Sequence, residues 1–188
     1  MLLGLLILGF GIQRMLISGC MGIVTVIGLL VSMTEKSTSG QIFNLGSGAI
    51  SWSTKKQDVV ALSSSEAEYV AVTSVACQGV WLRRLLVDIH QKQLGATAIF
   101  CDNKATIAMT KNPAFHSRTK HIDTRFHFIR NLTEKGEIAL EFCSTNDQVA
   151  DIFTKALSQV EHNDFRRRLG LCIFKARGSV VSSSKSSG

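Results

Sequence analysis

The sequence predicts an α/β fold, in which helices pack against a sheet. Three observations support this class. Short apolar runs rich in β-branched residues alternate with longer segments in which apolar residues recur every three or four positions. Turn residues separate these segments, and 45% of the 188 residues are apolar, which suffices for a core. We therefore expect one domain followed by a short tail.

The domain is expected to open with a hairpin. Gly46-Ser-Gly48 is a turn signal between two short apolar runs, residues 41–45 and 49–52. A polar connection then leads to a third strand candidate at residues 59–62. The spacing of these three runs predicts antiparallel neighbours.

A long helix follows, which Ser63 to Ser65 can cap and which extends to about His90. One face of this helix carries an apolar stripe at alternating steps of three and four residues. The stripe consists of Glu68, Val72, Val75, Gly79, Leu82 and Leu86. Glu68 is therefore expected to lie at the start of the buried face.

Shorter elements complete the domain. We expect strands at 97–101 and 138–142, a short helix at 103–110 that stops before Asn112-Pro113, a basic and aromatic helix at 122–134, a helix through Asp151 capped by Asn146 or Asp147, and a last helix at 159–169. The predicted organisation is an apolar segment (1–34), a domain (35–173) and a disordered Ser-rich tail (174–188).

Composition restricts the possible partners. Lys and Arg exceed Asp and Glu to give a net charge of +7, which favours a polyanionic partner. The five cysteines are widely spaced and form no C-x-x-C pair, so the sequence predicts neither a zinc knuckle nor a disulfide framework. This pattern fits a reducing, intracellular compartment and argues against secretion.

Three acidic residues lie in or next to apolar segments, where the fold should bury their side chains or bring them close together. Glu68 starts the apolar face of the long helix, Asp102 follows a buried strand, and Asp151 starts a later helix. Isolated buried carboxylates are costly, so three of them suggest a metal cluster. The simpler alternative is that each acid caps a helix. Glu66 is the rival of Glu68, but it lies about 160° away around the helix.

The motifs around these acids resemble the ribonuclease H domain of copia-type LTR retrotransposon Pol polyproteins. The matching segments occur in family order over about Lys36 to Leu171: Lys36-Ser-Thr-Ser-Gly40, Ala49-Ile-Ser-Trp52, Ser65-Glu-Ala-Glu-Tyr69, Cys101-Asp-Asn103, His116-Ser-Arg-Thr-Lys-His-Ile-Asp123 and Ala150-Asp-Ile-Phe-Thr-Lys155. The resemblance implies a ribonuclease H-like fold, with a mixed five-stranded sheet flanked by helices. It also implies a C-terminal fragment of a longer polyprotein.

The resemblance implies that Glu68, Asp102 and Asp151 are catalytic and bind two Mg²⁺ ions, with Mn²⁺ as a possible substitute. The reaction would be hydrolysis of the RNA strand of RNA–DNA hybrids during reverse transcription. The reverse transcriptase domain of the parent polyprotein would be a partner. The expected location is a cytoplasmic virus-like particle or the nucleus.

The family's fourth acid lies on a central first strand, and no acid precedes Glu35 in this chain. That strand is therefore missing or replaced, and we expect weak or no cleavage. The alternatives are a catalytically dead remnant that binds nucleic acid and a membrane-anchored ribonuclease H-like protein.

The first 34 residues allow three explanations. Met15 to Ser32 is uncharged over 18 residues, the lower limit for a transmembrane helix, but a membrane partner is the less favoured alternative. Gly22 to Ile27 is β-branched and also fits a buried strand. The third explanation, which we favour, is an out-of-frame reading of the family's first strand.

The frame change can be followed by hand. Reading the third base of each codon from Gly19 to Leu29 with the first two bases of the next permits Leu-His-Gly-Tyr-Cys-Asp-Ser-Asp-Trp-Ala. This resembles the family's first-strand motif, and its glycine is forced by Met21 and Gly22. A single inserted base near Lys36 would explain the shift.

Basic residues near the motifs are candidates for phosphate contacts. Lys and Arg provide such contacts without reading sequence, and an A-like hybrid is recognised by its shape. The candidates are Lys55 in the hairpin, Arg118, Lys120 and His121 in a basic loop, and Arg125 on the helix after it.

Overall fold

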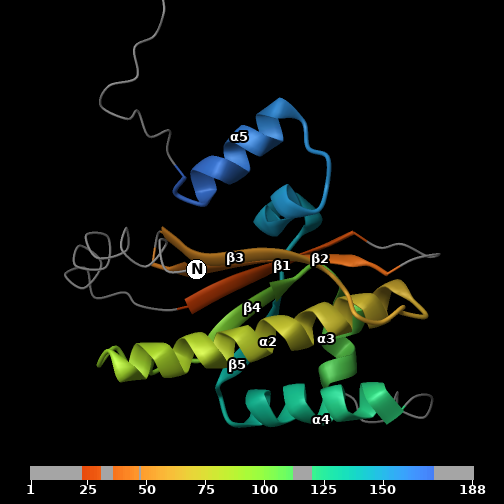
Figure 1. Ribbon diagram of the computed structural model, residues 1–188, viewed down its shortest axis with the longest axis vertical. Helices are drawn as coiled ribbons and strands as arrows, with labels where there is room; N and C mark the ends of the chain where they lie inside the picture. The colour runs from red at the N-terminus through yellow and green to blue at the C-terminus, as the bar shows by residue number, and fades with distance from the viewer. Residues whose placement is uncertain (1–22, 31–35, 47, 112–119, 172–188) are drawn as a thin grey trace, which may run out of the picture.

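A five-stranded mixed sheet lies between two layers of helices in the computed structural model, which describes residues 23–30, 36–46, 48–111 and 120–171 (Figure 1). The strands are β1 (Ile23–Leu30), β2 (Thr38–Leu45), β3 (Gly48–Lys56), β4 (Thr97–Cys101) and β5 (Ile138–Phe142). The helices are α2 (Ser64–Asp88), α3 (Lys104–Lys111), α4 (Lys120–Glu134) and α5 (Gln159–Arg168), with 3₁₀ helices η2 (Thr145–Asp147) and η3 (Val149–Phe153).

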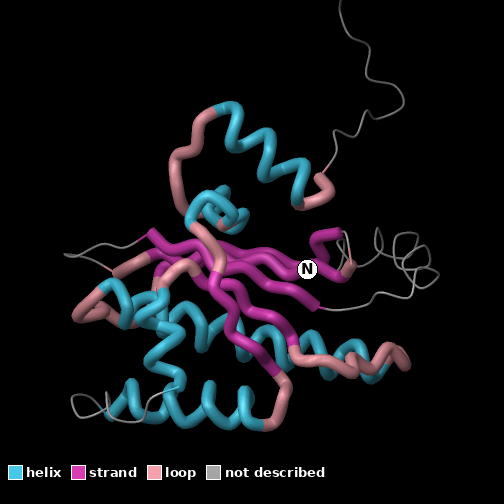
Figure 2. The backbone as a smooth tube through the Cα atoms, turned by 180° about the vertical axis from the view of Figure 1, so that it is seen from behind, coloured by secondary structure: helices cyan, strands magenta, loops and turns pink. Residues whose placement is uncertain are grey.

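The spatial order of the strands is β3-β2-β1-β4-β5. β1 pairs with β2 in antiparallel direction and with β4 in parallel direction. The helices α2, α3 and α4 lie on one side of this sheet, whereas η3 and α5 lie on the other (Figure 1). Figure 2 shows the same layers from behind, with the strands between them. These features confirm the predicted ribonuclease H-like class of α/β fold.

The apolar N-terminal segment supplies the central strand. Of the two predicted alternatives, a missing or a replaced first strand, the structure contains the second. Val24, Thr25 and Val26 of β1 are in register with Ala98, Ile99 and Phe100 of β4. A short β-branched run suits a central strand that is covered on both faces. Because β1 belongs to the sheet, the sheet begins before the predicted boundary at residue 35, and residues 23–30 are not part of a helix.

Two local predictions need correction. Residues 59–62 do not form a strand: Val60 and Leu62 are 52% and 76% exposed, so this stretch buries no apolar face. It instead leads into the capped start of α2. The element that carries Asp151 is the 3₁₀ helix η3 rather than an α-helix. The predicted tail at 174–188 lies outside the described residues.

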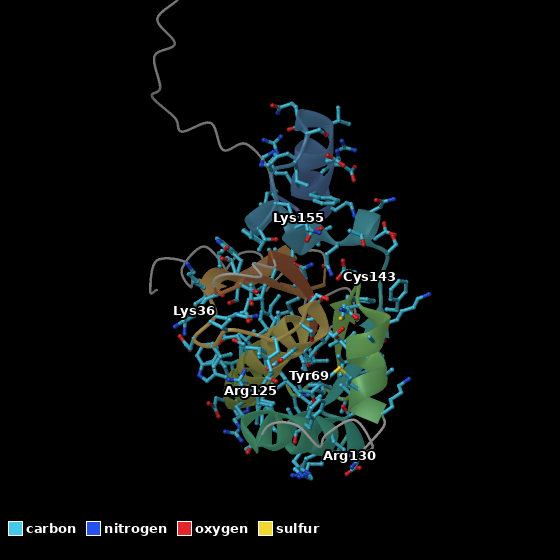
Figure 3. The ribbon with its side chains drawn as sticks, turned by 90° about the vertical axis from the view of Figure 1, so that its right-hand side faces the viewer. Lys36, Tyr69, Arg125, Arg130, Cys143 and Lys155 are labelled. Carbon is cyan, nitrogen blue, oxygen red and sulfur yellow. The ribbon has the colours of Figure 1, made fainter. Side chains whose placement is uncertain are left out.

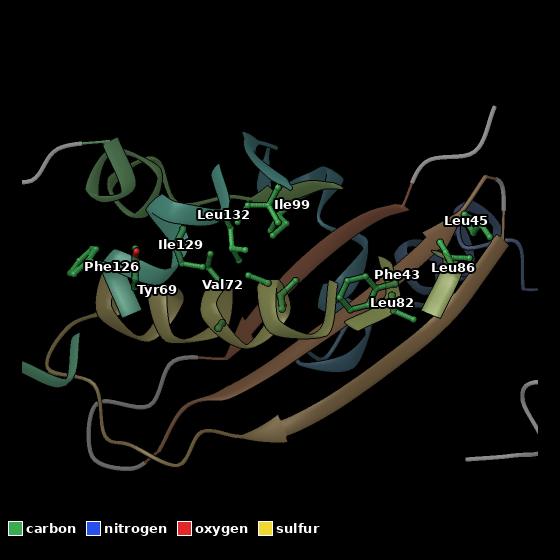
Figure 4. Close-up of a cluster of buried hydrophobic side chains, with 14 residues drawn as sticks. Phe43, Leu45, Tyr69, Val72, Leu82, Leu86, Ile99, Phe126, Ile129 and Leu132 are labelled. Carbon is green, nitrogen blue, oxygen red and sulfur yellow. The ribbon is translucent and has the colours of Figure 1, made fainter. Parts of the chain in front are cut away.

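Two apolar clusters attach the helices to the sheet. The larger cluster joins α2 and α4 to β2, β4 and β5, and includes Val72, Val75, Leu82 and Leu86 of the predicted stripe of α2 (Figure 4). Tyr69 and Phe126 are in ring contact there, with centroids 4.1 Å apart. The smaller cluster joins β2 to η3 and α5 through Ile42, Val149, Ala150, Phe165 and Leu169.

Helix α2 is long and apolar enough to cross a membrane when only length and composition are considered. Its apolar stripe is, however, buried against the sheet, as in the core helix of a globular domain.

Gly40 permits the close approach of η3 to β2. A Cβ atom at this position would lie 3.0 Å from Cβ of Phe153, 3.0 Å from Cγ2 of Thr154 and 3.2 Å from the carbonyl oxygen of Ala150. We predict that Gly40→Ala lowers the free energy of unfolding by about 1 kcal/mol or more, because η3 must move. Urea denaturation measures this change. Gly95→Ala is the matched control, because a Cβ there meets nothing within 4 Å; equal effects of both variants would contradict the packing argument.

Candidate functional site

The three predicted acids meet at one end of the sheet. Glu68 lies in the first turns of α2 and is 4% exposed, Asp102 directly follows β4, and Asp151 lies in η3 and is 3% exposed. The charge of each of Asp102 and Asp151 acts on the carboxyl of Glu68. Acids from both helical layers and from the sheet therefore share one electrostatic environment.

The start of α2 separates the roles of its two glutamates. The backbone N–H of Glu66 donates to Oγ of Ser63 at 3.1 Å, and its carboxylate accepts from the N–H of Leu62 at 2.9 Å. Glu66 thus satisfies the end of its own helix. Glu68 instead accepts a hydrogen bond from Sγ of Cys101 at 3.5 Å, beside Asp102. This geometry agrees with the sequence-based preference for Glu68.

Asp102 does not cap the helix that follows it. Asn103 does so, because its side-chain oxygen accepts from the N–H of Thr106 at 3.1 Å. Asp102 accepts a hydrogen bond from Oγ1 of Thr145 at 3.2 Å, across 43 positions of sequence. The capping alternative therefore fails for this acid, and Thr145 orients its carboxylate.

Only one of the two carboxylate oxygens of Asp151 has a hydrogen-bond partner among the described residues. Its Oδ2 accepts from Nζ of Lys155 at 2.7 Å, which is also an ion pair. Its Oδ1 is buried and has no hydrogen-bond partner among the described residues. A buried carboxylate oxygen without a partner is costly, so this atom is a candidate ligand for a cation.

Burial and like charges make ionisation of this cluster unfavourable. Burial, followed by the charge of Asp102, raises the pKa of Glu68 to about 7. Burial also raises the pKa of Asp151, against the opposing effect of Lys155. The thiols of Cys101 and Cys143 have raised pKa values because they are buried beside these carboxylates. They stay protonated, so the donors available near neutral pH are carboxylate oxygens.

Hard oxygen donors of this kind suit Mg²⁺. Among the residues that the structure describes, no three His, Cys, Asp or Glu side chains are already grouped to hold one ion. The acids interact electrostatically but do not form a preformed metal site. A bound cation would lower the pKa of Glu68 and would give the buried Oδ1 of Asp151 a partner. β1 contains no acidic residue, so the central strand adds no carboxylate to Glu68, Asp102 and Asp151.

A second set of contacts holds the segment before Asp151. Nη2 of Arg168 donates to the carbonyl oxygen of Asp147 at 3.2 Å, and Oγ of Ser144 donates to the Asp147 carboxylate at 2.8 Å. Sequence reasoning assigned no role to Thr145 or Lys155. It took Asn146 or Asp147 as the cap of the element that carries Asp151, but Gln148 holds that position and makes no side-chain cap hydrogen bond. The Ser-x-x-Asp spacing at 144–147 is a local signal for the turn, but no local signal links Thr145 to Asp102.

The predicted nucleic-acid contacts are only partly described. Lys55 and Arg125 line one pocket of about 260 Å³. Lys120 and His121 begin α4, where only the backbone is described, and Arg118 lies outside the described residues. In the view of Figure 3, Arg125 and Cys143 lie on either side of Tyr69. None of Glu68, Asp102 and Asp151 lines the pocket, so the pocket and the acidic cluster are separate features of the molecule.

No family model matches the chain, but it has relatives among characterised proteins. The chain is 42% identical over 135 residues to the retrovirus-related Pol polyprotein from transposon RE2 of Arabidopsis thaliana, a match that covers 72% of this chain. It is 41% identical over 125 residues to that from transposon TNT 1-94 of Nicotiana tabacum, with 65% of this chain covered. Each match spans 9% of the relative's length.

A solved structure shows the same fold. The N-terminal ribonuclease H domain of Rv2228c from Mycobacterium tuberculosis, solved as a fusion with maltose-binding protein, aligns with a TM-score of 0.53 and 11% sequence identity. The alignment covers 79% of this chain and 98% of that one.

We predict a specific pH dependence from Glu68. Because its pKa is raised from 4.5 to about 7 in the folded state, the folded protein should lose stability as pH rises between these values. The loss is at most about 3 kcal/mol, and Glu68→Gln should remove it. Urea denaturation from pH 4 to pH 8 measures the difference between the two proteins.

Mg²⁺ should raise the melting temperature of the wild type more at pH 8 than at pH 5, since the ion needs the ionised carboxylate. Suppose that the Mg²⁺-induced rise in melting temperature differed between wild type and Glu68→Gln by the same amount at both pH values. That result would contradict the coupling between metal binding and ionisation of Glu68.

Proposed function

Because this chain belongs to the ribonuclease H region of copia-type retrovirus-related Pol polyproteins, we propose that it is a retrotransposon ribonuclease H module that recognises RNA–DNA hybrids. The observation that carries the proposal is the meeting of Glu68, Asp102 and Asp151, from three separate elements, at one end of a ribonuclease H-like sheet. The net charge of +7 fits a polyanionic substrate.

Glu68, Asp102 and Asp151 would hold Mg²⁺, or Mn²⁺ in its place, and the bound metal would activate water and stabilise the leaving oxygen of the RNA strand. The chain's own residues prepare this site. Thr145 orients Asp102, and Lys155 neutralises part of the charge on Asp151.

Cleavage by this chain is weak or absent in our proposal. A pair of metal ions would need carboxylate ligands in addition to Glu68, Asp102 and Asp151, and Ile23–Leu30 occupies the central strand without an acidic residue. This favours the second candidate function, a remnant that binds nucleic acid without cutting it. The membrane-anchored alternative is weaker, because residues 23–30 pair on both sides within the sheet.

The parent protein's context is also part of the proposal. The chain spans about a tenth of the length of the Pol polyproteins it matches, so a reverse transcriptase domain is its proposed partner. We propose an intracellular location, in a cytoplasmic virus-like particle or in the nucleus.

We predict no measurable Mg²⁺-dependent cleavage of an RNA–DNA hybrid by the purified chain. The assay is a gel that follows the labelled RNA strand. Cleavage that Asp102→Asn abolishes would overturn the proposed impairment, because it would show that three acids suffice.

We also predict that activity can be restored through β1. Replacing residues 20–29 with the shifted reading Leu-His-Gly-Tyr-Cys-Asp-Ser-Asp-Trp-Ala should produce measurable Mg²⁺-dependent cleavage where the original chain shows none, since it supplies the missing carboxylate. The control carries Asn in place of both Asp residues in the same segment. No gain over this control, in a protein that melts cooperatively, would count against the frame-change hypothesis.

A further inference from the structure

The short helix η2 brings Thr145 to Asp102, yet none of the residues of η2 is buried. Its position therefore depends on hydrogen bonds rather than on apolar packing. The backbone N–H of Asp147 donates to the carbonyl oxygen of Ser144 at 2.9 Å, and Oγ of Ser144 donates to the Asp147 carboxylate at 2.8 Å. These two bonds close the turn on itself but do not attach it to the rest of the protein.

Arg168 of α5 attaches this turn to the domain. Its Nη2 donates to the carbonyl oxygen of Asp147 at 3.2 Å, and its Nη1 donates to Oδ1 of the same residue at 3.4 Å. One guanidinium group thus holds both the main chain and the side chain of Asp147, as a planar fork of donors allows. The two side chains are 40% and 63% exposed, so the ion pair contributes little to global stability. Its main effect is on geometry.

The apolar core fixes Arg168 in turn. Cζ of Arg168 lies 5.7 Å from the ring centroid of Phe165, a side chain that is 6% exposed. Phe165 and Leu169 belong to the smaller apolar cluster, together with side chains of η3. Both α5 and η3 lie on the same side of the sheet (Figure 1). The helix that carries Arg168 is therefore fixed relative to the element that carries Asp151.

Helix α5 is thus connected to two of the three acids by separate routes. It packs on the element of Asp151, and it reaches Asp102 through η2. We propose that Arg168 is a positioning residue that, by holding η2, keeps the hydroxyl of Thr145 on the carboxylate of Asp102. The separation of the carboxylates of Asp102 and Asp151, and with it the affinity for a divalent cation, depends on this contact. The inference rests on the proposed metal binding by the acids.

The charge of Arg168 makes the direction of the effect informative. A positive charge near the acids repels a bound metal ion, so removing that charge alone should leave the metal affinity unchanged or raise it. Loss of the positioning contact should lower the affinity. Since the two effects have opposite signs, a change in net charge cannot imitate the proposed role.

The first test is the affinity of the purified full chain for Mn²⁺, measured by electron paramagnetic resonance of the free ion, which needs no catalysis. Contacts to metal ligands typically account for about 10–100-fold in affinity, so Thr145→Val should weaken binding about tenfold and Arg168→Gln about three- to tenfold. Arg168→Lys keeps the charge but loses the fork, and should weaken binding similarly. Asp102→Asn, which should lower the affinity further, verifies that the ion occupies the acidic cluster.

The matched control is Arg167→Gln. It removes the same charge from the neighbouring position of α5, where the guanidinium pairs with Asp164 at 3.6 Å instead of holding η2. This variant should bind Mn²⁺ at least as tightly as the wild type. Equal affinity of wild type, Arg168→Gln and Arg168→Lys would overturn the proposal, and so would equal weakening by Arg167→Gln.

A double-mutant cycle tests the route of the effect. Because Arg168 acts through Thr145, Arg168→Gln/Thr145→Val should bind Mn²⁺ no more weakly than Thr145→Val alone. Fully additive losses would show that Arg168 acts independently of Thr145, which would overturn the positioning role.

Amide NMR spectra of the metal-free protein separate this inference from the proposed function. Arg168→Gln should shift the signals of Asp102 and Asn103, whereas Arg167→Gln should not. If the wild type binds no Mn²⁺ yet shows these shifts on substitution, the proposed metal binding fails and the positioning contact stands. If the wild type binds Mn²⁺ and both Arg168 variants bind it equally well without the shifts, the positioning role fails and the metal site stands.

Discussion

The backbone pairing of β1 with both β2 and β4 is the interaction on which the rest of the structure depends. Without this strand, β2-β3 and β4-β5 would present two unpaired edges at the centre of the molecule. Main-chain hydrogen bonds do not require particular side chains. An apolar, β-branched segment can therefore fill the centre of the sheet without supplying a carboxylate.

The sequence predicted most of the fold because its signals were local. The stripe on α2, the Gly46-Ser-Gly48 turn and the apolar run at 97–101 each contain their own periodicity or turn chemistry. Residues 59–62 misled the strand prediction because β-branched composition does not show whether a partner strand exists. The role of residues 23–30 could not be chosen from sequence, because a buried strand and a membrane helix both require an uncharged apolar run.

The candidate site was predictable to the extent that its residues lie in motifs. Glu68 could be separated from Glu66 by helix geometry, because only Glu68 lies on the apolar stripe of α2. Both side chains are buried, but Glu66 bonds to the start of its own helix and Glu68 to Cys101 beside Asp102. Thr145 could not be found in this way, since its bond to Asp102 joins positions that are 43 residues apart. Lys55 and Arg125 were predicted separately as phosphate contacts, but the pocket that they share could not be predicted, because its lining comes from β2, β3, α2 and α4.

Phosphate contacts and the acidic cluster therefore place different physical demands on the chain. Phosphate contacts depend on cations near the surface, where each charge stays hydrated and the loss of one leaves the others in place. The acidic cluster depends on several buried charges that are unfavourable together, as the raised pKa of Glu68 shows. Such a cluster is tolerated when a cation is present to neutralise it. A central strand without an acid leaves fewer buried charges to neutralise, which is compatible with folding. Under the proposed function, the same strand supplies no ligand for a metal ion.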